Sequence, residues 1–195
     1  MQNKNIDIEN LIKTDSILFF DLDGTLVDTN YANFLSYKKA IYSVTKVDYD
    51  LVYNSKIRFN RTILKNTIPN LNESQFDKII IEKESSYNDF LHEIKLNHTV
   101  SDILIKYSRT NKTVLVTNCR KDRAITTLNY FNLYENFGNI FYRQFNVIEQ
   151  KINKYGNAIS KLNIMPSLII AFEDEETEIK DALDAGIINI NKIRI

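Results

Sequence analysis

Short runs of consecutive apolar residues recur along the chain and predict buried strands. Five runs have this character: Ile17–Phe20, Val114–Val116, Asn139–Tyr142, Ser167–Phe172 and Ile187–Ile190. Because their apolar residues are consecutive rather than alternating, the runs are typical of strands covered on both faces of a parallel sheet.

Apolar residues at helical spacing separate these predicted strands. The pairs that show it most clearly are Ile103 and Tyr107, Ala124 and Leu128, Tyr155 and Ile159, and Ile179 and Leu183. Gly186 is placed to end the last of these helices. From residue 99 onward, helices and strands therefore alternate, which predicts an α/β fold with a doubly wound parallel sheet.

Residues 29–97 interrupt this alternation. The spacing of Tyr31, Phe34 and Ile41 predicts one helix, and a second, longer helix is predicted to start near Asn72. No strand is predicted in this stretch. We therefore expect an all-helical module of residues 29–97 inserted into an α/β core of residues 1–28 plus 98–195.

Composition narrows the range of partners. The formal net charge is zero, so the sequence does not indicate a nucleic acid or an anionic membrane as a partner. Cys119 is the single cysteine, which suits a reducing compartment. No apolar stretch approaches the roughly 18 residues of a membrane span, and the first residues lack the apolar core of a signal peptide. These features predict a cytoplasmic protein.

Polar side chains follow three of the predicted strands. Asp21 and Asp23 come after the first, with Gly24 beside them; Thr117-Asn118 and Glu173-Asp174 follow two others. Ligands of open parallel sheets bind at the carboxyl ends of the strands, so we expect these residues to converge on one site. Two carboxylates beside a glycine suit phosphoryl chemistry, in which one attacks and the other handles a proton.

Three motifs resemble those of the haloacid dehalogenase-like (HAD) superfamily. Asp21-Leu22-Asp23-Gly24-Thr25-Leu26 resembles its first motif, Val114-Leu115-Val116-Thr117-Asn118 the second, and Phe172-Glu173-Asp174 the fourth. The resemblance implies a Rossmann-like core. It also implies that the helical insertion is the cap of the subclass that includes phosphoglycolate phosphatase and β-phosphoglucomutase.

The resemblance assigns a role to each residue of these motifs. Asp21 would attack phosphorus and form an aspartyl-phosphate, and Asp23 would act as general acid and base. The carboxylates of Asp21 and Asp174, with the backbone carbonyl of Asp23, would bind Mg²⁺. The Thr117 hydroxyl and the Asn118 backbone N–H would bind phosphoryl oxygens.

The lysine of the third motif has two candidates. Lys151 and Lys154 both precede the helix that contains Tyr155, and the Lys-Pro pair of many relatives is absent. The spacing from Lys151 to Tyr155 matches relatives with a short loop, so we predict Lys151 and keep Lys154 as the alternative. We expect Arg120, Lys121 and Arg123, which follow the second motif, to lie mostly on the surface.

The predicted activity is Mg²⁺-dependent hydrolysis of a small phosphate monoester. The retained acids Asp23 and Asp174 favour phosphoryl transfer over haloacid dehalogenation, which needs neither. Two alternatives stay open: a sugar phosphomutase, and a non-catalytic protein that binds or regulates through the same fold. The expected partner is a small phosphate ester, and the expected state is a monomer or weak homodimer.

Overall fold

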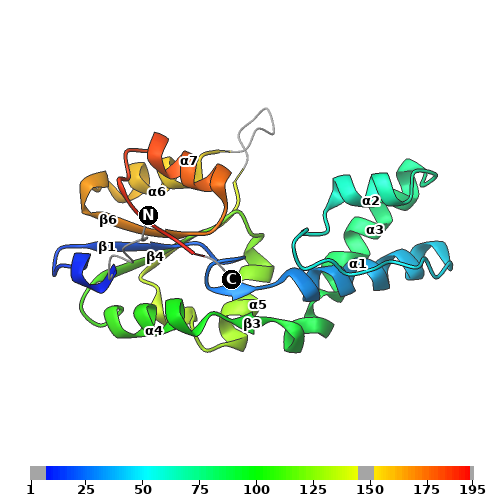
Figure 1. The fold of residues 1–195 in the computed structure, drawn as a ribbon, viewed down its shortest axis with the longest axis horizontal. Coiled ribbons are helices and arrows are strands. Elements are labelled where there is room, and N and C mark those ends of the chain that lie inside the picture. Colours follow the sequence, from blue (N-terminus) through cyan, green and yellow to red (C-terminus); the bar gives the residue numbers. More distant parts are fainter. Residues whose placement is uncertain (1–7, 145–151, 194–195) are drawn as a thin grey trace, which may run out of the picture. The chain divides into compact units, whose positions relative to one another are not determined.

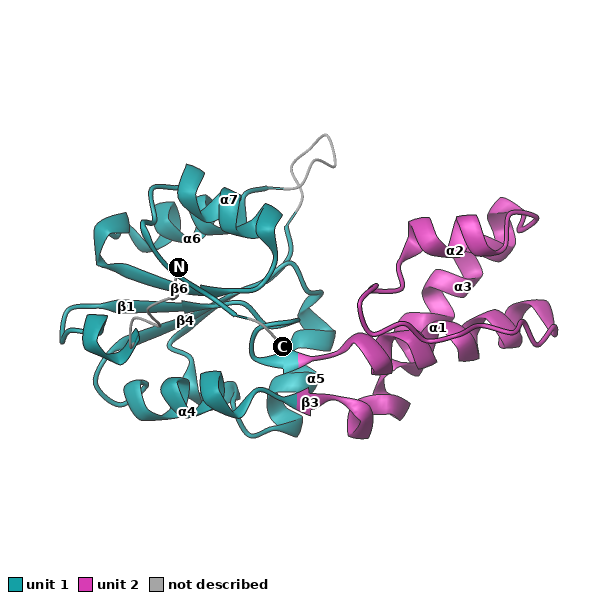
Figure 2. Cartoon of the chain, in the orientation of Figure 1, with its two compact units in different colours: residues 1–27, 96–195 teal, residues 28–95 magenta. Residues whose placement is uncertain are grey.

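The computed structural model describes residues 8–144 and 152–193, which form two compact units. Unit 1 consists of Met1–Val27 and Leu96–Ile195, and unit 2 of Asp28–Lys95 (Figure 2). The predicted division differs from this one by one residue at the first boundary and by two at the second.

Unit 1 is built on a five-stranded parallel sheet in the order β5-β4-β1-β6-β7. Its strands are β1 (Ile17–Phe20), β4 (Lys112–Val116), β5 (Asn139–Phe141), β6 (Ile169–Glu173) and β7 (Asn189–Lys192). From the central β1 the chain adds strands first on one side and then on the other. This doubly wound arrangement confirms the predicted α/β fold class.

Helices cover both faces of this sheet, as Figure 1 shows. Helices α4 (His98–Tyr107) and α5 (Lys121–Tyr130) lie on one face, and α6 (Lys154–Leu162) and α7 (Glu176–Asp184) lie on the other. The side chain of Asn97 caps the start of α4 and that of Asn153 caps the start of α6. Gly186 adopts φ +89° just beyond α7, which confirms the predicted helix end.

The central strand explains the consecutive apolar runs of the sequence. All four residues of β1 are buried. Phe19 belongs to a core cluster with Tyr155 of α6 and Ala182 of α7, and its neighbour Phe20 stacks on Phe172 with ring centroids 4.6 Å apart. A strand covered on both faces needs apolar residues at every position, and each buried Phe contributes about 1.5–3 kcal/mol.

Unit 2 is mainly helical and has its own core. It contains α1 (Asn30–Thr45), α2 (Arg61–Thr67), α3 (Glu73–Ser86) and the 3₁₀ helix η2 (Tyr87–Glu93). Tyr37 and Ile41 of α1 pack with Leu64 of α2 and Ile79 of α3. Asn72 caps α3 in a reciprocal arrangement with Gln75, so the predicted helix start is confirmed.

Short elements accompany these strands and helices, among them the 3₁₀ helices η3 (Tyr134–Asn136) and η4 (Pro166–Leu168). The two-residue strands β2 (Val27–Asp28) and β3 (Lys95–Leu96) form a separate small sheet, and a short 3₁₀ helix, η1 (Ile8–Leu11), precedes β1. The expectation of no strand within residues 29–97 was therefore wrong for β3, because two residues are too few to produce a periodic pattern. Among residues 8–144 and 152–193, no helix combines the length and apolar character that crossing a lipid bilayer requires.

Candidate active site

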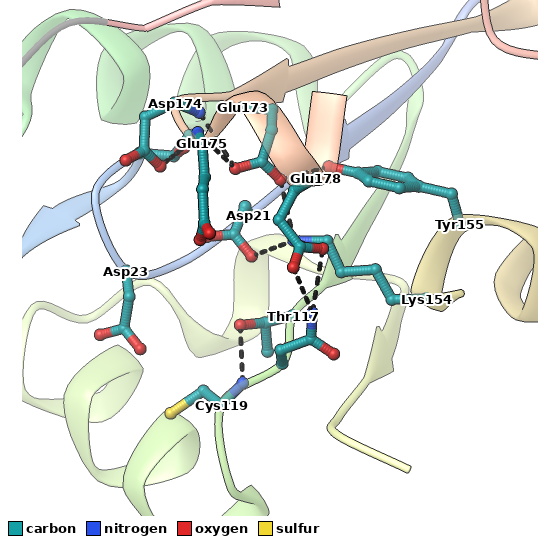
Figure 3. Close-up of polar contacts among 12 residues, drawn as sticks. Asp21, Asp23, Thr117, Cys119, Lys154, Tyr155, Glu173, Asp174, Glu175 and Glu178 are labelled. Atoms are coloured by element: carbon teal, nitrogen blue, oxygen red, sulfur yellow. Dashed lines mark hydrogen bonds and ion pairs between the residues drawn. The ribbon is translucent and has the colours of Figure 1, made fainter. Parts of the chain in front are cut away.

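The predicted site residues gather where β1, β4 and β6 end. Asp21 follows β1, Thr117 follows β4, and Asp174 follows β6 (Figure 3). The Asp21 N–H donates to the Phe172 carbonyl at 3.1 Å, so the β1–β6 pairing continues into the site. One carboxylate oxygen from each of Asp21, Glu173 and Asp174 lies within 4.8 Å of the others.

Gly24 lets the first loop approach Asp174. Its φ is +94°, and its N–H donates to the Val27 carbonyl at 2.8 Å. A Cβ at this position would lie 2.2 Å from Asp174 Oδ2, closer than atoms can approach. The next residue, Thr25, donates its hydroxyl to Asp174 Oδ1 at 3.0 Å. The turn thus needs glycine both for its backbone conformation and for space.

Lys154 is the lysine that the structure places against the nucleophile candidate. Its Nζ donates to Asp21 Oδ1 at 2.6 Å and to Glu173 Oε2 at 2.8 Å, and its side chain is only 5% exposed. Lys154 is the first residue of α6, directly after the capping Asn153, so the helix start fixes it. Lys151, which the sequence favoured, lies outside the described residues. Of the two candidates, Lys154, the alternative that the sequence left open, is the one that the structure describes in contact with Asp21.

Burial and excess negative charge shift the protonation equilibria here. Burial raises the pKa of Asp21 to about 8; Lys154 opposes this shift and Glu173 adds to it. Burial, with the neighbouring Glu173 carboxylate, raises the pKa of Asp174 to about 6. Burial alone would lower the pKa of Lys154, but Asp21, Glu173 and Glu178 together raise it above its ordinary value. The site therefore attracts cations.

Glu173 and Glu178 both lie near Lys154, and Glu173 accepts further hydrogen bonds from other groups. Glu173 Oε1 accepts the N–H groups of Asp174 and Glu175, and its Oε2 accepts the Tyr155 hydroxyl at 2.6 Å. Burial, followed by the Glu173 charge, raises the pKa of Tyr155 well above its ordinary value, so the hydroxyl keeps its proton. Glu178 is buried in α7 and lies 3.6 Å from Lys154 Nζ.

The loop after β4 carries the two predicted phosphate-binding residues. The Thr117 N–H donates to the Phe141 carbonyl at 2.9 Å, and the Thr117 hydroxyl oxygen accepts the Cys119 N–H at 3.1 Å. The Asn118 side chain donates to both carboxylate oxygens of Glu178 at 3.0 Å. These bonds anchor the loop beside Lys154.

The Asp23 carboxylate lies to one side of the Asp21–Lys154 contact (Figure 3). Its Oδ2 accepts a hydrogen bond from Arg123 Nη2 at 2.6 Å, and the two side chains are 12% and 13% exposed. Arg123 Nε also donates to Cys119 Sγ at 3.0 Å. Of the three basic residues expected to lie mostly on the surface, Arg120 and Lys121 are exposed and Arg123 is the exception. Its place in the first turn of α5, just after the Thr117 loop, brings it to Asp23.

The carboxylates fit a hard divalent cation. Asp21 and Asp174 offer oxygen ligands, the kind that Mg²⁺ prefers. Glu173 belongs to the same group of acids, but both of its oxygens already accept hydrogen bonds. The Asp23 carboxylate, which is not part of this group, is paired with Arg123.

Known structures share this fold. CbbY from Rhodobacter sphaeroides, solved with phosphate and as a variant with xylulose-(1,5)bisphosphate, has a TM-score of 0.71 at 16% identity, covering 91% of this chain and 86% of its own. A predicted phosphoglycolate phosphatase from Haemophilus somnus has a TM-score of 0.71 at 18% identity, covering 90% and 84%. A putative β-phosphoglucomutase from Thermotoga maritima has a TM-score of 0.66 at 22% identity, covering 91% and 84%.

Sequence comparison identifies the family directly. No curated protein matches the chain. The model of the family described as haloacid dehalogenase-like hydrolase matches residues 18–191, which include every described site residue. The chain belongs to the haloacid dehalogenase-like hydrolase family.

Proposed function

We propose that this protein is a Mg²⁺-dependent phosphatase that hydrolyses a small phosphate monoester through a covalent intermediate on Asp21. The observation that carries the proposal is the buried contact of Lys154 with Asp21, 2.6 Å long, beside the Asp174 carboxylate. A carboxylate that attacks a phosphate dianion meets like-charge repulsion, which Lys154 together with a bound cation would offset.

Asp21 is the proposed nucleophile. One of its carboxylate oxygens forms a bond to phosphorus as the bond from phosphorus to the ester oxygen breaks. Lys154 favours the ionised carboxylate that this step needs. Because burial works against ionisation of Asp21, the lysine and a bound cation have to offset it.

Asp23 is the proposed general acid and base. It gives a proton to the leaving ester oxygen and then takes a proton from the water that attacks the aspartyl-phosphate. That attack breaks the bond between phosphorus and Asp21 and releases inorganic phosphate. Arg123 contacts the Asp23 carboxylate, and Lys154 contacts the Asp21 carboxylate. The two acids therefore have different cationic partners.

Two groups after β4 complete the phosphoryl site. We assign binding of phosphoryl oxygens to the Thr117 hydroxyl and the Asn118 backbone N–H, because these atoms lie in the loop that Glu178 anchors next to Lys154. Charge spreads over the phosphoryl oxygens in the transition state, where such donors act.

Asp21, Asp174 and the Asp23 backbone carbonyl are the proposed ligands of Mg²⁺. Bound there, the ion would neutralise phosphoryl charge and orient the ester for attack. The fit rests on the all-oxygen donor set and on the excess of carboxylates over cationic side chains around Lys154.

A small phosphorylated metabolite is the proposed substrate, and unit 2 the proposed cap that contributes leaving-group selectivity. CbbY, which shares the fold, has been solved with phosphate and with a sugar bisphosphate. The test is a panel of phosphomonoesters assayed with Mg²⁺ for wild type and Asp21→Asn. We expect free phosphate from the wild type and at least a thousandfold less from the variant, on the order of the loss of an essential nucleophile.

Product analysis separates this activity from its alternatives. An isomerised sugar phosphate in place of free phosphate would identify a mutase. If no ester in the panel turns over and the protein captures no beryllofluoride at Asp21, the phosphatase proposal fails and a binding role remains.

A further inference from the structure

The ammonium group of Lys154 faces more carboxylates than it can neutralise. Its Nζ lies 2.6 Å from Asp21 Oδ1, 2.8 Å from Glu173 Oε2 and 3.6 Å from Glu178 Oε2. In a buried site these charges interact strongly, so the three acids compete for one cation. Lys154 contacts Asp21 and Glu173 at the same time, so the other donors to Glu173 and Glu178 decide how closely it approaches Asp21.

Glu173 has three other donors. Its Oε1 accepts the backbone N–H groups of Asp174 and Glu175 at 3.0 and 3.2 Å. Its Oε2, the oxygen that also contacts Lys154, accepts the Tyr155 hydroxyl at 2.6 Å (Figure 3). The Tyr155 bond is the shorter of the two on that oxygen and comes from a neutral group, so it stabilises Glu173 without using the lysine.

The position of Tyr155 is fixed by packing. The residue is fully buried in the core cluster of the sheet, and its ring stacks on Phe19 of β1 with centroids 6.4 Å apart. Its backbone N–H donates to the side chain of Asn153, the cap of α6. Lys154 and Tyr155 are therefore held together at the start of one helix, with both side chains directed at Glu173.

Glu178 is satisfied in the same manner. The Asn118 side chain donates to both of its oxygens at 3.0 Å, while Lys154 Nζ stays at 3.6 Å. Each competing carboxylate thus receives neutral donors, and the shortest contact of the lysine goes to Asp21.

We propose that Tyr155 is a positioning residue whose hydroxyl, by sharing Glu173 Oε2 with Lys154, keeps the ammonium group closer to Asp21 than to Glu173. Its effect on turnover rests on the proposed function, whereas its effect on the position of Lys154 does not. Without the hydroxyl, Glu173 draws the ammonium group toward itself and away from the nucleophile.

The test is Tyr155→Phe, which removes the hydroxyl and keeps the ring. In a crystal structure of the full-length variant we expect Lys154 Nζ to leave Asp21 Oδ1, beyond about 3.2 Å, and to approach Glu173. For an ester that the wild type hydrolyses, we expect kcat to fall about threefold to tenfold, the worth of one hydrogen bond, with KM unchanged within about twofold.

Two further variants separate this role from a structural one. Tyr107→Phe is a matched control, because it removes a tyrosine hydroxyl that donates to Glu9 at 3.2 Å from α4; we expect it to keep the wild-type kcat. Glu173→Gln removes the charge of the competitor, so adding Tyr155→Phe to it should change kcat less than about twofold.

The outcomes that overturn the proposal are distinct from failure of the proposed function. If Lys154 stays on Asp21 in Tyr155→Phe, or if that substitution lowers kcat equally in the Glu173→Gln background, Tyr155 does not position the lysine. If wild-type protein hydrolyses no phosphate ester, the proposed function fails, and the structure of Tyr155→Phe still decides where Lys154 goes.

Discussion

Replacing Lys154 with methionine removes the cationic side chain that contacts Asp21 while keeping an unbranched apolar chain. The Nζ makes contacts of 2.6 and 2.8 Å to two buried carboxylates. Breaking a buried ion pair costs about 3–5 kcal/mol of stability. Because Asp21 already has a pKa raised to about 8, it can take up a proton when the lysine is lost, so we expect a cost near the lower limit.

Both stability and turnover can be measured on this variant. A cost of about 3 kcal/mol lowers the Tm of a domain of this size by roughly 6–12 °C, measurable by circular dichroism. Loss of a fixed positive charge next to the reacting phosphoryl group should reduce kcat by about 100-fold to 1,000-fold in a phosphate-release assay.

The matched control is Lys161→Met, in the last turn of the same helix. Lys161 is exposed and makes one long contact, 3.4 Å, to Gln144. We expect wild-type kcat and Tm for this control. If Lys154→Met instead folds and keeps kcat within about threefold of wild type, Lys154 does not assist the reaction, and the reasoning from its contacts to catalysis is refuted.

Three further predictions concern the acids of the site. Arg123→Met should lower kcat about 10-fold to 100-fold, the worth of a charged hydrogen bond, and should affect esters with poor leaving groups most, because it releases Asp23; equal losses for all leaving groups would contradict this. The raised pKa values of Asp21, about 8, and Asp174, about 6, mean that the metal-free folded state binds protons more tightly than the unfolded state. These acids therefore stabilise the fold below about pH 4, and this contribution is lost as the pH rises toward 8, where Mg²⁺ can replace the protons. The increase in Tm caused by Mg²⁺ should thus be larger at pH 8 than at pH 5, and a constant increase would argue against metal binding by these acids. Gly24→Ala should destabilise the protein by at least about 1–2 kcal/mol in urea titrations, since alanine must adopt φ +94° and its Cβ would meet Asp174; an unchanged midpoint would show that the turn tolerates a side chain.

The sequence predicted the strands and helices of the core well because buried positions carry apolar residues. The four apolar residues of β1 are buried on both faces, and the glycine after α7 ends that helix, as their patterns indicated. The convergence of Asp21, Thr117 and Asp174 followed from topology, since parallel strands of one sheet bring their carboxyl ends together.

The sequence could not predict which polar side chains point into the active site. Lys151 and Lys154 are three positions apart in the sequence, and their spacing to Tyr155 does not reveal where α6 begins. The Asn153 cap makes Lys154 the first residue of that helix. Arg123 could not be distinguished from its exposed neighbours Arg120 and Lys121, because its partner, Asp23, is 100 positions away. The role of the Tyr155 hydroxyl likewise depends on Glu173, and nothing in the local sequence links them.

The most direct test of the central claim is chemical trapping of the intermediate. Wild-type protein would be mixed with Mg²⁺ and a ³²P-labelled ester that it hydrolyses, quenched in acid within one turnover, digested and analysed by mass spectrometry. We expect the phosphoryl group on the peptide that contains Asp21, and no label on that peptide in Asp21→Asn. Turnover by the wild type without any phosphoryl group on Asp21 would contradict the claim that this carboxylate is the nucleophile.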